Sequence, residues 1–110
     1  MIEAIVLGFL QEYVSGRKKN LIDNEGRRLT VRDAISRLSR ELLEFIERHP
    51  ENVIILVNGV SINNLRGLDT VVGDGDKIAI MPVVGGGSIP AEPLKILYEA
   101  HDIYLNFIPT

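Results

Sequence analysis

An apolar run followed by Asn58-Gly59 constrains the fold of this chain more than any other feature. Residues 53–57 read Val-Ile-Ile-Leu-Val, a length and composition typical of a buried β-strand. Asparagine and glycine accept the positive φ angles that a two-residue hairpin turn requires, so the chain is predicted to reverse here. A return strand is predicted at residues 60–62, which makes this part of the sheet antiparallel.

The segment before this hairpin is predicted to form one amphipathic helix from Thr30 to Pro50. The Thr30 hydroxyl can cap free amides of the first turn, and Asp33 suits the positive end of the helix dipole. Pro50 ends the helix, because the residue before a proline disfavours the helical region. Residues at steps of three and four form its core face: Val31, Ala34, Ile35, Leu38, Leu42, Phe45, Ile46 and His49.

Further strands are predicted at residues 2–10, 19–23 and 77–84, and Pro82 marks the end or an edge position of the last one. Residues 63–76 hold several turn formers and predict a connection with one helical turn. Within it, Asp74-Gly75-Asp76 is predicted to be a tight turn rather than a metal site. Two strands, a helix and further strands predict an α+β fold, a mixed sheet with one main helix across one face.

Composition narrows the classes of function. The 110 residues are enough for one compact domain, and the absence of cysteine excludes thiolate metal sites and cysteine nucleophiles. A net charge of −3 argues against a nucleic-acid binder, and no apolar run is long enough to span a membrane. The N-terminus has no basic segment followed by a cleavage site, so a cytoplasmic location is expected.

Residues 55–87 resemble the ubiquitin-like β-grasp sulfur carriers, and most of all the small subunit of molybdopterin synthase. The thiazole-biosynthesis sulfur carrier and prokaryotic ubiquitin-like modifiers belong to the same group. The resemblance implies a ubiquitin-like β-grasp domain over residues 1–87. The matching residues are Leu68-Asp69-Thr70, Asp74-Gly75-Asp76, Ala79-Ile80, Pro82, Val84 and Gly86-Gly87.

The resemblance also implies a chemistry, in which Gly87 is the acyl carrier and Gly86 is the residue before it. In the family, an ATP-using activating enzyme adenylates the terminal glycine carboxylate. The carboxylate then becomes a thiocarboxylate that donates sulfur, as in molybdopterin or thiamine biosynthesis, or it is joined to a protein lysine. The implied partners are this activating enzyme and a molybdopterin-synthase-like large subunit or another sulfur acceptor. The chain would bind no cofactor or metal and would be a carrier protein or synthase subunit rather than a self-contained enzyme.

The chain departs from the family by continuing beyond Gly87, from Ser88 to Thr110. Carrier chemistry at Gly87 therefore requires a processing protease that removes residues 88–110. About half of the residues in this extension are hydrophobic, and their pattern predicts a short helix and then a strand. An extension this apolar is expected to pack on its own domain or on a second copy of the chain.

Two other functions stay open. In the first, the glycines are only a hinge, and the protein is a non-catalytic β-grasp interaction module that forms a homodimer through its tail. In the second, it is a regulatory subunit that docks on a molybdopterin-synthase-like large subunit while the tail blocks transfer.

Overall fold

The structure is a computed structural model that describes residues 1–83. The predictions for Gly86, Gly87 and the extension over residues 88–110 lie outside the described residues. The strands, α-helices and 3-10 helices (η) follow in this order: β1 (Ile2–Val6), η1 (Gly8–Val14), β2 (Lys19–Ile22), β3 (Leu29–Thr30), α1 (Val31–Leu38), α2 (Arg40–Arg48), η2 (Pro50–Asn52), β4 (Val53–Val57), β5 (Val60–Ser61), η3 (Ile62–Asn64), η4 (Gly67–Asp69), β6 (Val71–Val72) and β7 (Lys77–Pro82).

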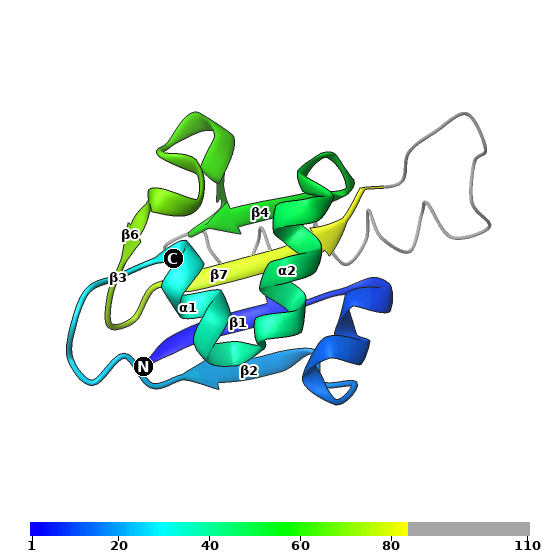
Figure 1. Ribbon diagram of the computed structural model, residues 1–110. Helices are drawn as coiled ribbons and strands as arrows, with labels where there is room; N and C mark the ends of the chain where they lie inside the picture. The colour runs from blue at the N-terminus through cyan, green and yellow to red at the C-terminus, as the bar shows by residue number, and fades with distance from the viewer. Residues whose placement is uncertain (84–110) are drawn as a thin grey trace.

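Five strands form a mixed sheet in the order β2-β1-β7-β4-β5. The last strand, β7, lies in the middle, parallel to β1 and antiparallel to β4. Helices α1 and α2 lie across one face of this sheet (Figure 1). The arrangement confirms the predicted α+β, ubiquitin-like β-grasp fold.

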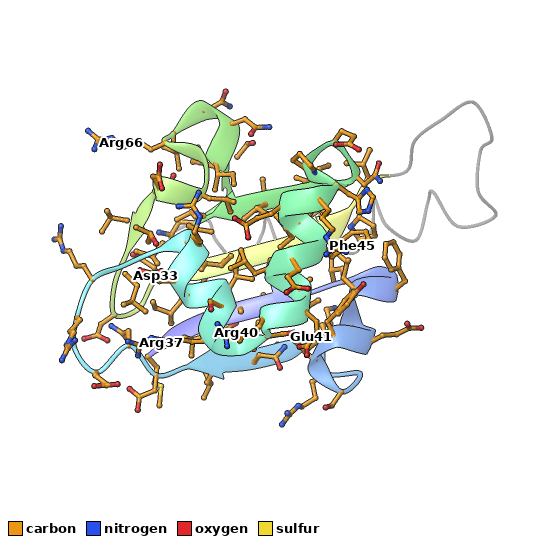
Figure 2. All side chains as sticks on the ribbon, viewed as in Figure 1. Asp33, Arg37, Arg40, Glu41, Phe45 and Arg66 are labelled. Carbon is orange, nitrogen blue, oxygen red and sulfur yellow. The ribbon has the colours of Figure 1, made fainter. Side chains whose placement is uncertain are left out.

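The main core lies between this face and the helices. Alternate residues of each strand point to it, as the two-residue period of a strand requires. Leu42 of α2 and Ile35 of α1 are fully buried against Ile80 and its neighbours. Charged residues of the helices, including Asp33, Arg37, Arg40 and Glu41, lie on the exposed side (Figure 2). No helix within residues 1–83 is long and apolar enough to cross a membrane.

The predicted single helix is broken at Ser39. This residue has extended backbone angles (φ −164°, ψ 119°), so it ends α1 and begins α2. Its amide donates a hydrogen bond to Ile35 O (2.8 Å), and its hydroxyl accepts one from Leu42 N (3.1 Å). Serine competes for backbone groups in this way, which favours a cap over a helix interior. The Thr30 cap is confirmed, since its hydroxyl accepts a hydrogen bond from Asp33 N (3.1 Å).

Three further predictions were wrong in detail. The first strand ends at Val6, because Gly8 takes a positive φ of 63° and begins η1 instead. The return strand ends at Ser61, and Ile62 begins η3 and is buried. The connection after it contains two 3-10 helices and a short strand, β6, which pairs with β3 in a second sheet.

The hairpin turn is confirmed. Asn58 and Gly59 have φ angles of 50° and 85°, and Val57 pairs with Val60 across the turn. The Asn58 side chain also fastens the hairpin to the start of β7, because it accepts a hydrogen bond from Lys77 N (3.0 Å) and donates one to Asp76 Oδ1 (3.1 Å). The hairpin and the central strand are therefore held in register at one end of the sheet.

Candidate functional site

The end of β7 is the described feature nearest in sequence to the glycines. On one side of it, Leu7, the residue just after β1, donates a hydrogen bond from its amide to Ile80 O (2.9 Å). On the other side, Pro82 pairs with Val53, and Val83 N donates to Asn52 O (2.8 Å). The strand is thus hydrogen-bonded up to Ile80 on the β1 side and up to Val83, the last described residue, on the β4 side.

Gly8 completes this fastening from the side of η1. It packs against the Pro82 ring so closely that a Cβ at Gly8 would lie 2.8 Å from Pro82 Cγ. Its positive φ of 63° is a conformation that glycine adopts without steric cost. Pro82 has no amide hydrogen, so it suits a position where the ladder ends. It is buried, which leaves Val83 as the first exposed residue after the strand.

An aromatic group lies over α2 and η1, next to the turn that holds Val83. Phe45 is at its centre, with ring centroids 5.7 Å from Phe9, 5.8 Å from Tyr13 and 5.1 Å from His49. Phe9 is half exposed, and Figure 2 shows Phe45 on the side where the described chain ends. His49 is the C-cap of α2, and its carbonyl accepts a hydrogen bond from Asn52 N (2.9 Å). These aromatic side chains therefore support the Pro50–Asn52 turn, which lies beside Val83 at the end of β7.

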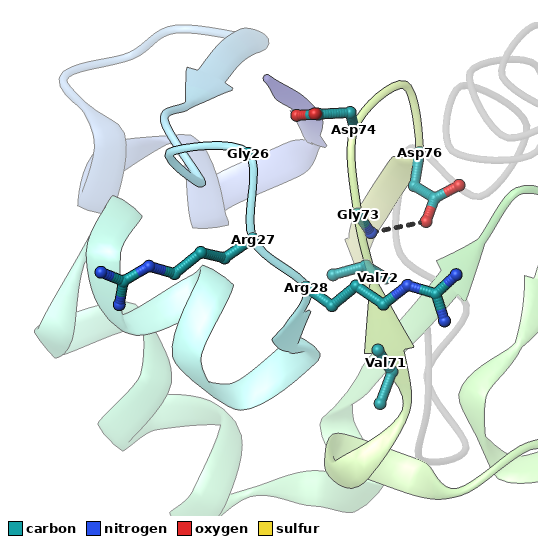
Figure 3. A pocket seen from close by; sticks show the side chains of 8 residues that line it. All are labelled: Gly26, Arg27, Arg28, Val71, Val72, Gly73, Asp74 and Asp76. Carbon is teal, nitrogen blue, oxygen red and sulfur yellow. Dashed lines mark hydrogen bonds between the residues drawn. The ribbon is translucent and has the colours of Figure 1, made fainter.

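The Asp74-Gly75-Asp76 segment lies at the opposite end of β7, and its carboxylates hold a turn. Asp76 Oδ2 accepts a hydrogen bond from Gly73 N (2.7 Å; Figure 3), and Gly75 has a φ of 83°. Asp74 Oδ1 lies 2.9 Å from the N-terminal amine, which donates a hydrogen bond and lowers the pKa of that carboxyl. Within residues 1–83, no three acidic or histidine side chains come close enough to hold a metal ion.

A polar hollow of about 450 Å³ adjoins this turn, between the loop at Gly26–Arg28 and β6. Figure 3 shows the Arg28 side chain crossing Val72 towards the Asp76 side, while Arg27 extends the other way. The two guanidinium groups therefore do not converge on one point, and the hollow does not present a phosphate clamp.

Gly8 and Asn52, which hold the end of β7 in place, were not predicted from the sequence. Nothing in the sequence marks Asn52 as important, because it acts through its backbone carbonyl, a group that every residue has. Gly8 does carry a signal: an isolated glycine inside an apolar run is typical of a close backbone approach. Gly86 and Gly87 come shortly after Val83 in the sequence and lie outside the described residues.

Comparison with known proteins places this geometry in a family. The ThiS family pattern matches residues 5–87. A protein of Archaeoglobus fulgidus, named as a candidate sulfur carrier, is 33% identical over 73 residues, which cover 60% of this chain and 83% of the relative.

Solved structures show the same fold. CysO from Mycobacterium tuberculosis matches with a TM-score of 0.62 and 24% identity, over 76% of this chain and 100% of its own. A chain of the BexX/CysO complex from Amycolatopsis orientalis matches with a TM-score of 0.61 and 22% identity, over 79% and 100%. The small archaeal modifier protein 1 from Methanosarcina acetivorans matches with a TM-score of 0.55 and 23% identity, over 78% and 95%.

The family pattern covers most of the chain and ends at Gly87, and the archaeal relative is matched over most of its length. Together with the mixed sheet and its central last strand, these matches show that the chain belongs to the ThiS family of ubiquitin-like β-grasp sulfur carriers.

Proposed function

We propose that this chain is the precursor of a sulfur carrier or protein modifier whose working end is the Gly87 carboxylate. The observation that carries the proposal is the fastened end of β7: the strand is held up to Val83, and the family pattern ends shortly afterwards, at Gly87. A strand end that is held in place and followed by glycines suits a flexible segment, or arm, that carries an acyl group into a partner enzyme. Glycine has no Cβ and accepts φ angles of either sign, so it can pass through a channel as narrow as a backbone.

The proposed chemistry has three steps. A protease first hydrolyses the Gly87–Ser88 amide, which gives Gly87 a free carboxylate. In an activating enzyme, this carboxylate attacks the α-phosphate of ATP, and pyrophosphate leaves. Sulfide from a donor then displaces AMP to form a thiocarboxylate, or a protein lysine displaces AMP to form an amide.

The chain itself supplies the arm and a docking face, and it needs no bound cofactor, because ATP belongs to the activating enzyme. The acceptor is a molybdopterin-synthase-like large subunit or another sulfur-accepting protein. The BexX/CysO complex supports the idea that this fold docks on a partner.

The first test is the mass of the protein isolated from its own cells. A chain that ends at Gly87 is expected. A full-length chain, found under conditions in which the cell uses its carriers, would favour the interaction module, in which the glycines are a hinge.

The second test is pyrophosphate exchange with ATP and an activating enzyme from the same cells. A chain ending at Gly87 should form the acyl-adenylate, whereas the full-length chain should not, because its Gly87 carbonyl is part of an amide. Gly86→Val should abolish exchange, since a β-branched residue narrows and stiffens the arm. Gly85→Ala is the matched control, and it should retain exchange because alanine adds only a methyl group and leaves the last two glycines of the arm unchanged. An enzyme that binds the Gly87-ended chain without activating it would refute the proposal.

A further inference from the structure

Strand β2 is an outer strand of the five-stranded sheet, and its open edge lies beside α1. In the order β2-β1-β7-β4-β5, β1 is its one partner among residues 1–83. The strand at the opposite edge, β5, has two residues and leads directly into η3, whereas β2 has four. Figure 1 shows β2 along one border of the sheet, and α1 contacts it. The longer open edge of the sheet is therefore that of β2.

The backbone of β2 presents hydrogen-bonding groups along this edge. Val6 N donates a hydrogen bond to Lys18 O (2.8 Å). In an antiparallel pair alternate residues bond to the neighbouring strand, so Lys18 and Asn20 turn their backbone groups towards β1. Lys19 and Leu21 turn theirs outward, and in the described part of the chain no backbone group bonds to them there. An extended segment can pair with these groups as an additional strand.

An open hollow of about 630 Å³ adjoins this edge. It is lined by residues 19–23, by Arg17, and by Arg37 and Leu38 of α1. Leu21 is 67% exposed on the face of the sheet away from the helices, and Leu38 is half-buried on the helix side. Successive side chains of a strand point to opposite faces. An added strand can therefore place one set of its side chains against Leu38 and the other set beside Leu21.

The side chains around this hollow are mostly cationic, although the whole chain has a net charge of −3. Arg17 and Lys19 form no ion pair within residues 1–83. Arg37 donates a hydrogen bond to Asp23 O (2.9 Å) and lies 3.3 Å from Glu25 Oε1. The Asp23 carboxylate accepts a hydrogen bond from Glu25 N (2.9 Å), so it is engaged in its own turn. Two exposed cations at this edge are thus available to a negatively charged segment.

We propose that the edge of β2 binds an extended acidic segment of a partner protein, which adds to the sheet as a further strand. Arg17 lies at one end of the edge and Arg37 at the other, so carboxylates on both sides of a central apolar residue suit it best. A second copy of this chain suits it less, because it would bring the same cations against these cations. Lysine on an edge strand also opposes pairing between copies. Since β1 separates β2 from β7, binding here leaves the end of β7 free.

Amide hydrogen exchange, followed by nuclear magnetic resonance on the full-length chain, tests strand addition. The probe is a peptide blocked at both ends, Glu-Glu-Val-Thr-Val-Thr-Val-Glu-Glu. At saturation it should slow exchange of the Lys19 and Leu21 amides by about tenfold or more, because these N–H groups gain an acceptor. Val60 and Ser61, at the opposite edge, should keep their exchange rates. The control peptide has Lys in place of every Glu and should bind about tenfold more weakly or less.

Substitutions in the chain test the charge and the backbone separately. Arg17→Glu should weaken binding of the acidic peptide about tenfold, because it turns attraction into repulsion. Arg66→Glu is the matched control: Arg66 is exposed, lies far from β2 (Figure 2) and gives the same change in net charge. It should alter the affinity by less than about twofold, because salt screens distant charges. Leu21→Pro should abolish binding, because it removes the outward N–H, and an edge strand tolerates this loss. Unchanged amide signals from β1 would show that the Leu21→Pro variant is folded.

Several results would overturn the proposal. Absence of binding would do so, as would binding without slower exchange at Lys19 and Leu21, which would mean contact through charge alone. Equal weakening by Arg17→Glu and Arg66→Glu would mean attraction to the overall charge of the chain. Exchange at Lys19 and Leu21 that slows as the protein concentration rises, without peptide, would mean that a second copy occupies the edge. None of these results bears on adenylation at Gly87, so failure here is distinguishable from failure of the proposed function.

Discussion

Gly8 and Pro82 are in such close contact that a single added methyl group has no room between them: its carbon would lie 2.8 Å from Pro82 Cγ. Gly8→Ala should therefore destabilise the fold by about 1–3 kcal/mol, through strain at positive φ and displacement of the Pro82 ring. Urea unfolding measures this. Gly16→Ala is the matched control, because Gly16 has a similar φ of 73° with nothing within 4 Å of the added carbon. An equal loss in both variants would show that the contact with Pro82 has no effect.

Ser39→Ala should lower the free energy of unfolding by about 0.5–2 kcal/mol, because the cap on Leu42 N is lost at a buried position. Ser36→Ala, one turn earlier inside α1, should be neutral or slightly stabilising, since alanine has the higher helix propensity. Thermal unfolding followed by circular dichroism compares the two. A Ser39→Ala variant as stable as the parent would mean that the break between the helices does not depend on the cap.

Leu42→Ala should cost about 2–5 kcal/mol, because this side chain is fully buried between α2 and the sheet. Leu21→Ala, at a residue 67% exposed, should change stability by less than about 0.5 kcal/mol. Chemical denaturation of both variants provides the comparison. Similar losses at the two positions would contradict the assignment of the core.

Asp74→Asn should reduce the sensitivity of the fold to acid. The pKa of Asp74 is lowered by its hydrogen bond with the N-terminal amine, so the carboxylate favours the folded state. This contribution is complete above the unfolded pKa of about 3.9 and is lost as the pH falls through the lower folded value. The pair is exposed, so the difference between variant and parent should be small and should shrink in high salt. Melting temperatures across this pH range, at low and high salt, measure it, and an unchanged acid response would contradict the pairing.

The fold class was predictable because its main signals are local. The positive φ angles at Asn58-Gly59 follow from the two residues themselves, and the Thr30 cap is a short-range hydrogen bond. The order of the elements then restricts how a sheet and helices can pack. The break at Ser39 was missed because the spacing of apolar residues, three or four apart, continues through it. Leu38 of α1 and Leu42 of α2 face the same way although they belong to two helices.

What could not be predicted depends on pairing between distant segments. Strands β3 and β6 are very short and lie far apart in the sequence, one just before α1 and the other just after η4, so neither forms a recognisable pattern alone. Thr70-Val71-Val72, a run of β-branched residues, was the available hint. At the candidate site, the role of Gly86 and Gly87 stays a prediction from the sequence, whereas the contacts of Gly8 and of the Asn52 carbonyl with the end of β7 required the fold.

The fixed end of β7 also limits how far the Gly87 carbonyl can extend from the domain into an enzyme that uses it. The arm from Val83 to Gly87 is short, and the amide of Val83 is bonded to Asn52. Five residues, from Val83 to Gly87, span at most about 3.3–3.6 Å each, so the carbonyl can reach no further than roughly 16–18 Å from that anchor. A partner whose nucleotide lies deeper than this below its docking surface could not react with this chain, so the depth of that cleft becomes a criterion for choosing among candidate activating enzymes.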